Sequence, residues 1–212
     1  MQGFVLAGGQ STRMGRDKAL LELEGRPLVA RAVETLRALG IEVRICGGQQ
    51  GGPRTVELAR YAEVIPDSFA GCGPLGGIEA GLAASDTELN LFLAVDLPAV
   101  SPEFLQWMAV RAERSGAVAT IPRCGGREQP LCAVYRRPLL DGLQTMMGAG
   151  HLKVVTAVRE AAGVLGERID CFDVETVAAA LGEGEWPATP PARDWLRNVN
   201  TPQDYERMRA GH

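Results

Sequence analysis

Leu6-Ala7-Gly8-Gly9-Gln10-Ser11-Thr12-Arg13-Met14-Gly15-Arg16-Asp17-Lys18 begins at the end of an apolar run, residues 3–7, that is typical of a buried first strand. The two adjacent glycines let the backbone approach an anion closely and turn its N–H groups toward it. The serine and threonine add neutral donors, and Arg13 and Lys18 add positive charge. A strand that leads into such a loop is suited to hold a polyphosphate.

The order of residues in this loop excludes two common nucleotide-binding motifs. The loop lacks the Gly-Lys-Ser/Thr ending of a Walker A sequence, and it lacks the G-x-G-x-x-G pattern of dinucleotide-binding loops. The alternative is a glycine-rich surface turn with two unrelated cations. Thirteen ordered positions directly after a strand disfavour that alternative.

Composition places the chain among soluble globular proteins. Its 212 residues, with 46% hydrophobic and 23% charged residues, suit one α/β domain over residues 1–212. No apolar run approaches the ~20 residues that span a bilayer, and the start of the chain has no export signal. The formal net charge of -4 argues against a general nucleic-acid surface. We expect a cytoplasmic protein that binds neither nucleic acid nor membrane.

The cysteines and histidines exclude further classes of site. The five cysteines form no C-x-x-C pair, and their odd number and scatter suit reduced cytoplasmic thiols. With only two histidines in the chain, a histidine-rich zinc site and a Cys-His nucleophile are both disfavoured.

Strands and helices are predicted to alternate along the chain. Strands are expected at residues 41–46, 63–67, 89–95, 117–121, 130–135 and 168–172. Helices are expected at 28–39, 55–61, 79–84, 101–115, 137–147, 151–162 and 174–181. This alternation predicts a three-layer α/β/α fold with a mostly parallel sheet, in which ligands bind at the carboxyl ends of the strands.

The most strand-like run, residues 89–95, ends at Asp96-Leu97-Pro98. Because the run is apolar on both faces, it predicts a central parallel strand. A carboxylate at the tip of a central strand is a suitable magnesium ligand, which makes Asp96 the strongest single candidate. The alternative is a helix cap or an Asx-turn, where aspartate is also common.

Three other segments carry candidate residues. Residues 71–78 are rich in glycine and open a helix, where free N–H groups favour an anion, although tight helix–sheet packing would also need glycines. Residues 122–129 form a predicted basic loop. Asn198 and Asn200 are spaced to point the same way from an extended segment, as amides able to read a polar ring edge. The alternative is a helix start, capped at Thr201 with Pro202 at the first helical position.

Four of these segments, in order, resemble those of the nucleotidyltransferases that act on the molybdenum cofactor, a family within the fold of the nucleotide-sugar pyrophosphorylases. They are L-A-G-G-x-S-x-R-M-G-x-D-K, G-P-L-x-G, D-x-P and N-x-N-T-P, and they span nearly the whole chain. The resemblance implies a nucleotide-diphospho-sugar transferase-like, Rossmann-like architecture. It also implies a nucleotide-binding half at about residues 1–100 and a pterin-substrate half at about 101–212.

The resemblance implies transfer of GMP from GTP to the terminal phosphate of molybdopterin carrying molybdenum, with release of pyrophosphate. The alternatives are a CTP-dependent cofactor cytidylyltransferase, a sugar-phosphate nucleotidyltransferase and, more remotely, a non-catalytic nucleotide-binding module or cofactor chaperone. The implied partners are GTP and the molybdenum-loaded pterin, with transient contact to proteins that deliver the cofactor or receive it.

The resemblance also implies a role for each candidate residue. The implied catalytic residues are Arg13, Lys18 and Asp96, with Asp96 as the ligand of Mg²⁺. The implied nucleotide-binding residues are Leu6, Ala7, Gly8, Gly9, Lys18, Asp67 and Asp96. The implied contacts to the pterin substrate are Asn198, Asn200 and Arg127. The chain departs from the family at Cys46-Gly47, where an asparagine often touches the nucleotide.

Overall fold

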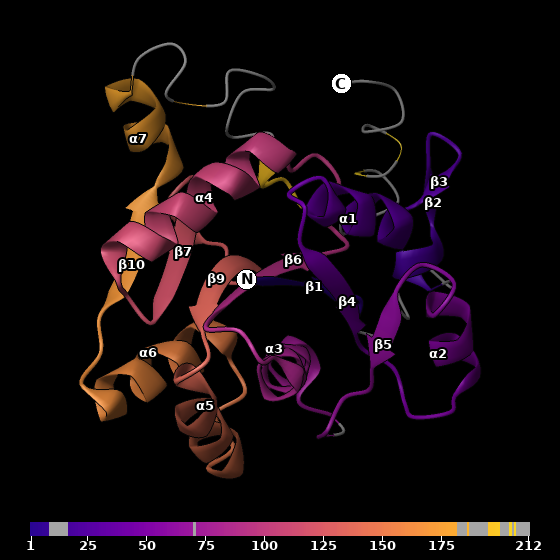
Figure 1. Ribbon diagram of the computed structural model, residues 1–212, viewed down its shortest axis with the longest axis horizontal. Coiled ribbons are helices and arrows are strands. Elements are labelled where there is room, and N and C mark those ends of the chain that lie inside the picture. Colours follow the sequence, from indigo (N-terminus) through magenta and orange to yellow (C-terminus); the bar gives the residue numbers. More distant parts are fainter. Residues whose placement is uncertain are drawn as a thin grey trace.

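The computed structural model describes residues 1–8, 17–69, 71–181, 186, 195–199, 204 and 206 (Figure 1). The strands are β1 Gln2–Leu6, β2 Glu22–Leu23, β3 Arg26–Pro27, β4 Glu42–Cys46, β5 Glu63–Ile65, β6 Leu89–Ala94, β7 Ala119–Cys124, β8 Arg127–Glu128, β9 Cys132–Arg136 and β10 Ile169–Asp173. The helices are α1 Leu28–Arg37, α2 Pro53–Leu58, α3 Gly73–Ala84, α4 Pro102–Ser115, α5 Leu139–Gly148, α6 Val154–Leu165 and α7 Val174–Ala180, and a short 3-10 helix, η2, covers Lys18–Leu20. Over the residues that are described, no helix combines the length and the apolar character needed to cross a membrane.

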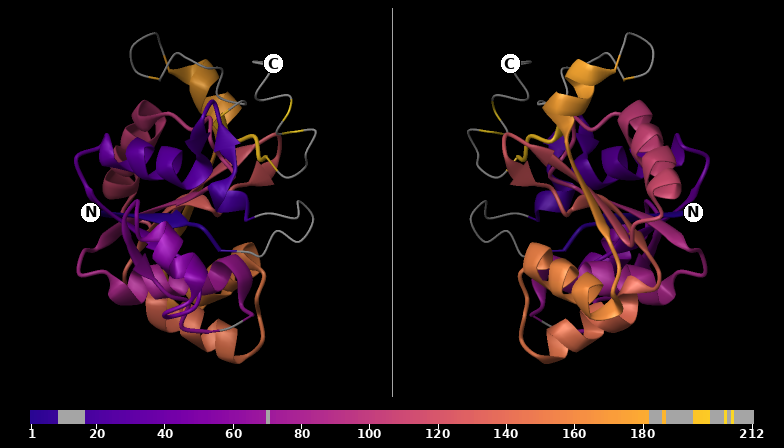
Figure 2. Two further views of the ribbon diagram at one scale, coloured as in Figure 1. Left: turned by 90° about the vertical axis from the view of Figure 1, so that its right-hand side faces the viewer. Right: turned by 90° about the vertical axis from the view of Figure 1, so that its left-hand side faces the viewer.

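The central sheet has eight strands in the order β10-β7-β9-β6-β1-β4-β5, with β8 paired to β7. Strand β9 is antiparallel to its neighbours β6 and β7, and the remaining neighbours in this order are parallel. Figures 1 and 2 show α1 and α4 over one face of the sheet, and α3, α5 and α6 over the other. The predicted three-layer, mostly parallel α/β/α fold is therefore confirmed.

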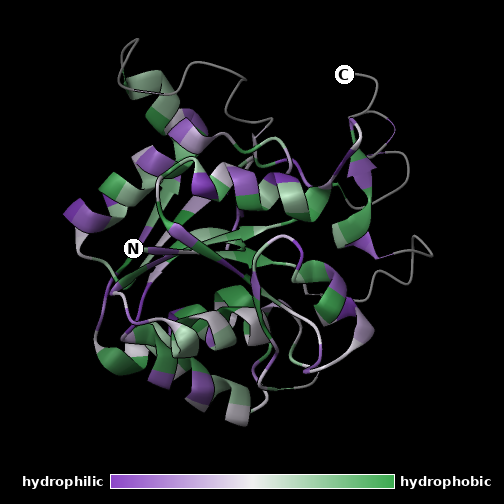
Figure 3. Cartoon of the chain, turned by 45° about the vertical axis from the view of Figure 1, so that its right-hand side comes forward, coloured by the Kyte–Doolittle hydropathy of each residue, from purple (hydrophilic) through white to green (hydrophobic). Residues whose placement is uncertain are grey.

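Two hydrophobic clusters, one on each face of the sheet, form the core. One joins the sheet to α1 and α4, and the other joins it to α3, α5 and α6. Figure 3 shows the hydrophobic residues of the central strands lying between the two helix layers. Strand β6 is central, as its apolar sequence predicts, but it is parallel only to β1 because β9 returns on its other side.

Local sequence signals account for the ends of α4, the helix that follows β6. The Ser101 hydroxyl accepts a hydrogen bond from the N–H of Phe104 at 3.2 Å, and Pro102 occupies the first turn. Gly116 ends the helix in the left-handed conformation, at φ 66. The predicted helix at 101–115 is thus confirmed.

The predicted loop at residues 122–129 is wrong. Strand β7 continues to Cys124, and Arg127 and Glu128 pair back onto it as β8. Gly125 and Gly126 have positive φ values of 54 and 74, which is the backbone of a two-residue hairpin turn. The glycines that suggested a loop therefore make a tight hairpin. A second, small hairpin pairs β2 with β3.

Candidate active site

The carboxyl ends of four neighbouring strands come together at one edge of the sheet. Leu6 of β1 is in register with Cys46 of β4 and with Ala94 of β6, and Cys46 is in register with Ile65 of β5. Backbone hydrogen bonds extend this alignment by one residue, from Ala7 N to Cys46 O at 2.9 Å. In an open α/β sheet, ligands bind in the crevice at this edge. The register therefore brings together four segments that the sequence predicted separately.

The first loop, the part of the chain between β1 and Lys18, begins at a backbone that is hydrogen-bonded and buried. The side chains of Leu6 and Ala7 are buried, and the Leu6 carbonyl accepts a hydrogen bond from Val95 N at 3.2 Å. Gly8 is the first exposed residue. Gly9 and Arg13, both predicted from the sequence, lie outside the described residues. At this end of β1 the exposed surface therefore begins at Gly8, because the two preceding side chains face the core.

Lys18 and Asp96 are 78 positions apart in sequence and form an ion pair. Lys18 Nζ donates to Asp96 Oδ2 at 3.1 Å, and the two side chains are 16% and 19% exposed. Lys18 opens helix η2, and Asp96 follows the central strand β6. A partly shielded ammonium and carboxylate at a strand edge provide a cation and an acidic ligand for phosphate chemistry. The structure thus joins two of the three predicted catalytic residues.

The segment at residues 195–199, near the end of the chain, is joined to the backbone of Asp96. Val199 N donates to the backbone carbonyl of Asp96 at 2.9 Å. Trp195 is fully buried and packs on Phe104 of α4, with ring centroids 5.0 Å apart, which anchors this segment. Asn198, the residue before Val199, is exposed next to Asp96. Asn200 and the predicted final helix start at Thr201 lie outside the described residues.

Asp67, which follows β5, has an unusual environment. Its N–H donates to the Gly48 carbonyl at 3.2 Å, while its Oδ1 atom is buried and has no hydrogen-bond partner among the described residues. Burial raises the pKa of the Asp67 carboxyl above its ordinary value, and the Arg54 guanidinium opposes this shift in part. The Oδ1 atom of Asp67 is therefore a buried hydrogen-bond acceptor that no described residue uses.

We expect Asp67→Asn to stabilise the free protein near neutral pH. Because the folded-state pKa lies above the unfolded value, the charged form is penalised in the folded state, and stability is lost as the pH rises through the folded pKa. Since the group is only half-buried, the expected gain in melting temperature at pH 7 is about 1–3 °C.

The gain should shrink to zero below about pH 3, where the wild-type carboxyl is protonated in both states. Thermal melts over a pH series measure it, with Asp86→Asn, at an exposed position, as the matched control. A gain that is the same at every pH would contradict the assigned cause.

The departure from the family at Cys46 has a structural reason. The Cys46 side chain is fully buried, burial raises the pKa of its thiol, and a Cβ atom on Gly81 of α3 would lie 3.1 Å from its sulfur. It therefore faces the helix layer and cannot touch a nucleotide. Gly77 is equally constrained, because its Cβ would lie 3.0 Å from Leu6 Cδ2. Gly77 and Gly81 thus serve helix–sheet packing, whereas Gly73 and Gly76, nearer the start of α3, have no strand residue among these close contacts.

The basic residues of the β7–β8 hairpin lie further away. Strand β9 separates β7 from β6, so these two strands are about 10 Å apart. Arg127 is exposed at the same carboxyl edge of the sheet, and no contact joins it to Asp96 within the described part of the chain. Arg123 lies in β7, and its half-exposed side chain forms an ion pair with Asp173 at 3.5 Å.

Arg54 is a residue of this site that sequence reasoning missed. It lies in the first turn of α2, and its guanidinium donates to both carboxylate oxygens of Asp17 and to the carbonyl oxygen of Ala7. The available signal was its place after the glycine-rich connection at residues 47–52, at the carboxyl end of β4. An arginine there faces the same edge as the first loop.

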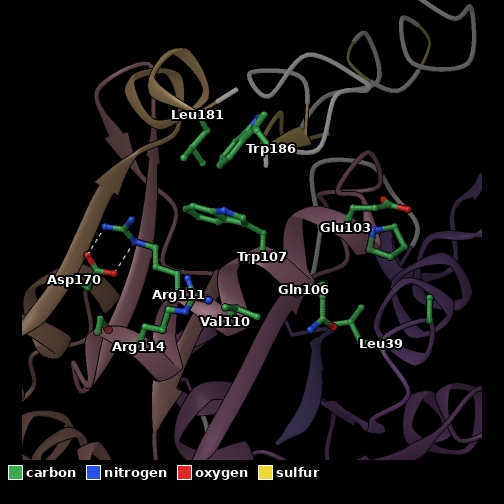
Figure 4. A pocket seen from close by; sticks show the side chains of 13 residues that line it. Leu39, Glu103, Gln106, Trp107, Val110, Arg111, Arg114, Asp170, Leu181 and Trp186 are labelled. Carbon is green, nitrogen blue, oxygen red and sulfur yellow. Dashed lines mark hydrogen bonds and ion pairs between the residues drawn. The ribbon is translucent and has the colours of Figure 1, made fainter. Parts of the chain in front are cut away.

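A groove of 1090 Å³ lies elsewhere on the surface, along α4 (Figure 4). Arg111 forms a bidentate pair with Asp170 there, at 2.7 and 2.8 Å, and Trp107 and Trp186 line the groove. None of the predicted site residues lines it. The groove is therefore separate from the predicted site at the strand edge, and it carries no functional assignment.

Comparison with known proteins places this geometry in context. Residues 3–163 match the family model described as the MobA-like NTP transferase domain. A probable molybdenum cofactor guanylyltransferase from Pelotomaculum thermopropionicum is 36% identical over 153 residues, which cover 72% of each chain. A molybdenum cofactor guanylyltransferase from Syntrophotalea carbinolica is 31% identical over 209 residues, covering 97% of this chain and 89% of that relative.

Solved structures show the same fold. Molybdopterin-guanine dinucleotide biosynthesis protein A from Archaeoglobus fulgidus superposes with a TM-score of 0.78 at 25% identity, covering 99% of this chain and 97% of that one. A 2-C-methyl-D-erythritol 4-phosphate cytidylyltransferase from Thermus thermophilus superposes with a TM-score of 0.64 at 18% identity, covering 99% and 97%. The second likeness concerns the fold alone.

Proposed function

The chain belongs to the MobA-like NTP transferase family and is a nucleotidyltransferase, and from this premise we propose that it transfers GMP from GTP to molybdenum-loaded molybdopterin. The observation that carries the proposal is the Lys18–Asp96 pair, which lies 3.1 Å apart where the Gly8 loop leaves the sheet. The names of the curated relatives support guanosine as the transferred nucleoside.

The proposed reaction needs no histidine base. An oxygen of the terminal phosphate of the pterin attacks the α-phosphorus of GTP, the bond to the β-phosphate oxygen breaks, and pyrophosphate leaves. Because the attacking phosphate is already anionic, the protein must align the two substrates and stabilise charge. In this proposal Lys18 neutralises charge on the leaving pyrophosphate, a role that Arg13 would share. The unpartnered Asp67 Oδ1 would accept from the ribose or the base.

Asp96 fits the Mg²⁺ that the family implies. Its Oδ2 contacts Lys18, while its Oδ1 receives no hydrogen bond from the residues that are described. The described residues hold no group of three or more metal-binding side chains. Magnesium is commonly bound by one or two carboxylates together with substrate phosphates, so a single carboxylate suffices. When bound, the ion would neutralise charge on the reacting phosphates.

The second substrate is proposed to bind next to the nucleotide, toward the second half of the chain. Asn198 adjoins the residue that hydrogen-bonds the Asp96 backbone, and Arg127 adds a cation at the same sheet edge. On this proposal, residues 1–100 hold the nucleotide and residues 101–212 supply the pterin contacts. The cytoplasm remains the proposed location, where the five free cysteines would stay reduced.

The test is a direct assay. Purified protein is incubated with GTP, Mg²⁺ and molybdenum-loaded molybdopterin, and the release of pyrophosphate and the mass of the dinucleotide product are measured. Reactions without the pterin and with CTP are the matched controls. Absence of pyrophosphate from both nucleotides would overturn the proposal, and turnover with CTP alone would reassign the chain to cytidylyl transfer.

Gly8→Ala tests the choice of nucleotide. A Cβ atom at Gly8 would meet no atom of the described residues within 4 Å, so we expect the methyl group to act on the ligand and not on the fold. We expect it to crowd a purine more than a pyrimidine and to shift the GTP/CTP ratio of kcat/KM toward CTP by about 10–100-fold. Steady-state kinetics with both nucleotides, in both proteins, measure the shift. Equal use of GTP and CTP by the unaltered protein would contradict the guanylyl assignment.

A further inference from the structure

The Arg54 side chain joins the two ends of the first loop. Its Nη2 donates to the carbonyl of Ala7, the residue before Gly8, and to Asp17 Oδ1 at 3.0 Å. Its Nε donates to Asp17 Oδ2. The guanidinium therefore holds the Asp17 carboxylate with two parallel hydrogen bonds and fixes the exit of the loop relative to its entry.

Asp17 connects Arg54 to the Lys18–Asp96 pair through helix η2. Its Oδ1 accepts a hydrogen bond from Ala19 N at 3.0 Å and caps helix η2. Lys18, the first residue of η2, reaches Asp96 Oδ2 at 3.1 Å. The direction of the Lys18 side chain is thus set by a capped turn whose capping carboxylate is itself held by Arg54.

The charged side chains of Arg54, Asp17, Lys18 and Asp96 are partly buried, so their ion pairs differ from ordinary pairs on the surface. Side-chain exposure is 25% for Arg54 and 21% for Asp17, close to the values at Lys18 and Asp96. Exposed pairs contribute little to structure, whereas hydrogen bonds between shielded charges are stronger and hold geometry better. Arg54 also lies near Asp67, so its charge acts on two segments of the same edge.

We propose that Arg54 is a positioning residue that fastens both ends of the nucleotide loop and so holds Lys18 against Asp96. This inference rests on the proposed function in one respect, because its kinetic test measures GMP transfer. Only arginine offers donors in a planar fork that can hold one carboxylate and a neighbouring carbonyl together. The competing interpretation is that Arg54 serves as a positive charge alone, either for a phosphate or for Asp67.

Four variants separate these interpretations: Arg54→Ala, Arg54→Lys, Asp17→Asn and the double variant R54A/D17N. Arg60→Ala, exposed beyond the end of α2, is the matched control. For each protein, kcat and KM for GMP transfer, the Kd for GTP with Mg²⁺ by titration calorimetry, and the melting temperature are measured.

We expect Arg54→Ala, Arg54→Lys and Asp17→Asn each to lower kcat/KM by at least about tenfold, mainly through kcat, because a small misplacement of the loop is costly. The double variant should be no worse than the more damaged single variant, as for residues that act as one unit. Arg60→Ala should behave as wild type. We also expect each of the three single variants to bind GTP more weakly, which provides a readout that does not depend on turnover.

Two results would overturn the proposal. Full activity of Arg54→Lys would show that only charge is needed, and independent, multiplying effects in R54A/D17N would show that the pair is not a unit. If Arg54→Ala does not fold, Arg54→Lys and Asp17→Asn decide the question. If the unaltered protein binds GTP but releases no pyrophosphate, the proposed function fails. The role of Arg54 is then still tested by the GTP Kd values, which should be weaker in the single variants, no weaker in the double variant and unchanged in Arg60→Ala.

Discussion

Asp96→Asn is expected to lower the turnover of GMP transfer by about 10²–10³-fold, because one carboxylate carries the proposed contact to Mg²⁺. The substitution keeps the size of the side chain and leaves an oxygen for Lys18 at the same position. It removes the negative charge that attracts the ion. Because the residue follows β6 at the sheet edge and is not in the core, the melting temperature should change by no more than a few degrees.

Steady-state kinetics over a Mg²⁺ titration measure this effect. Asp86→Asn is the matched control, since Asp86 is an exposed aspartate just before the other end of β6 and should have wild-type kinetics. A higher Mg²⁺ requirement together with low turnover supports the assigned role. Near-normal turnover at saturating Mg²⁺ would remove Asp96 from the metal site.

Gly47→Ala is expected to have the largest effect on stability, lowering the free energy of unfolding by roughly 2–4 kcal/mol. Gly47 has a φ of 140, which side chains rarely adopt. A Cβ atom there would also lie 2.9 Å from the backbone nitrogen of Gly8 and 3.2 Å from the carbonyl carbon of Ala7. The loop that leaves β1 would have to move, so GTP affinity should fall as well.

Variants at two other glycines separate the two causes of the loss expected at Gly47, the unfavourable φ and the close contact with the first loop. At Gly40 the φ of 72 is also unfavourable for alanine, but an added Cβ meets none of the described atoms within 4 Å, so Gly40→Ala should cost only about 1 kcal/mol. Gly8→Ala has neither problem and should leave stability unchanged. Urea unfolding of the three variants gives the comparison. A loss at Gly47 no larger than that at Gly40 would show that the contact with the first loop does not matter.

Much of the fold could be predicted from local sequence. Helix α4 has its hydroxyl cap, its proline and its final glycine in the sequence, and β6 is marked by its apolar run. These signals depend on residues a few positions apart, so they do not need the tertiary structure. The hairpin at Gly125-Gly126 was missed because the same two glycines suit an open loop and a tight turn.

For the candidate site, too, some features follow from the sequence and others only from the tertiary structure. The sequence by itself determined the class of chemistry, placed a carboxylate after the central strand, and predicted a loop suited to phosphate. It could not show that Lys18 contacts Asp96, that Val199 binds the Asp96 backbone or that Arg54 joins the two ends of the loop. Nor could it place β9 between β6 and β7. These relations depend on strand order and register between segments distant in sequence, and only the packing of the whole sheet fixes them.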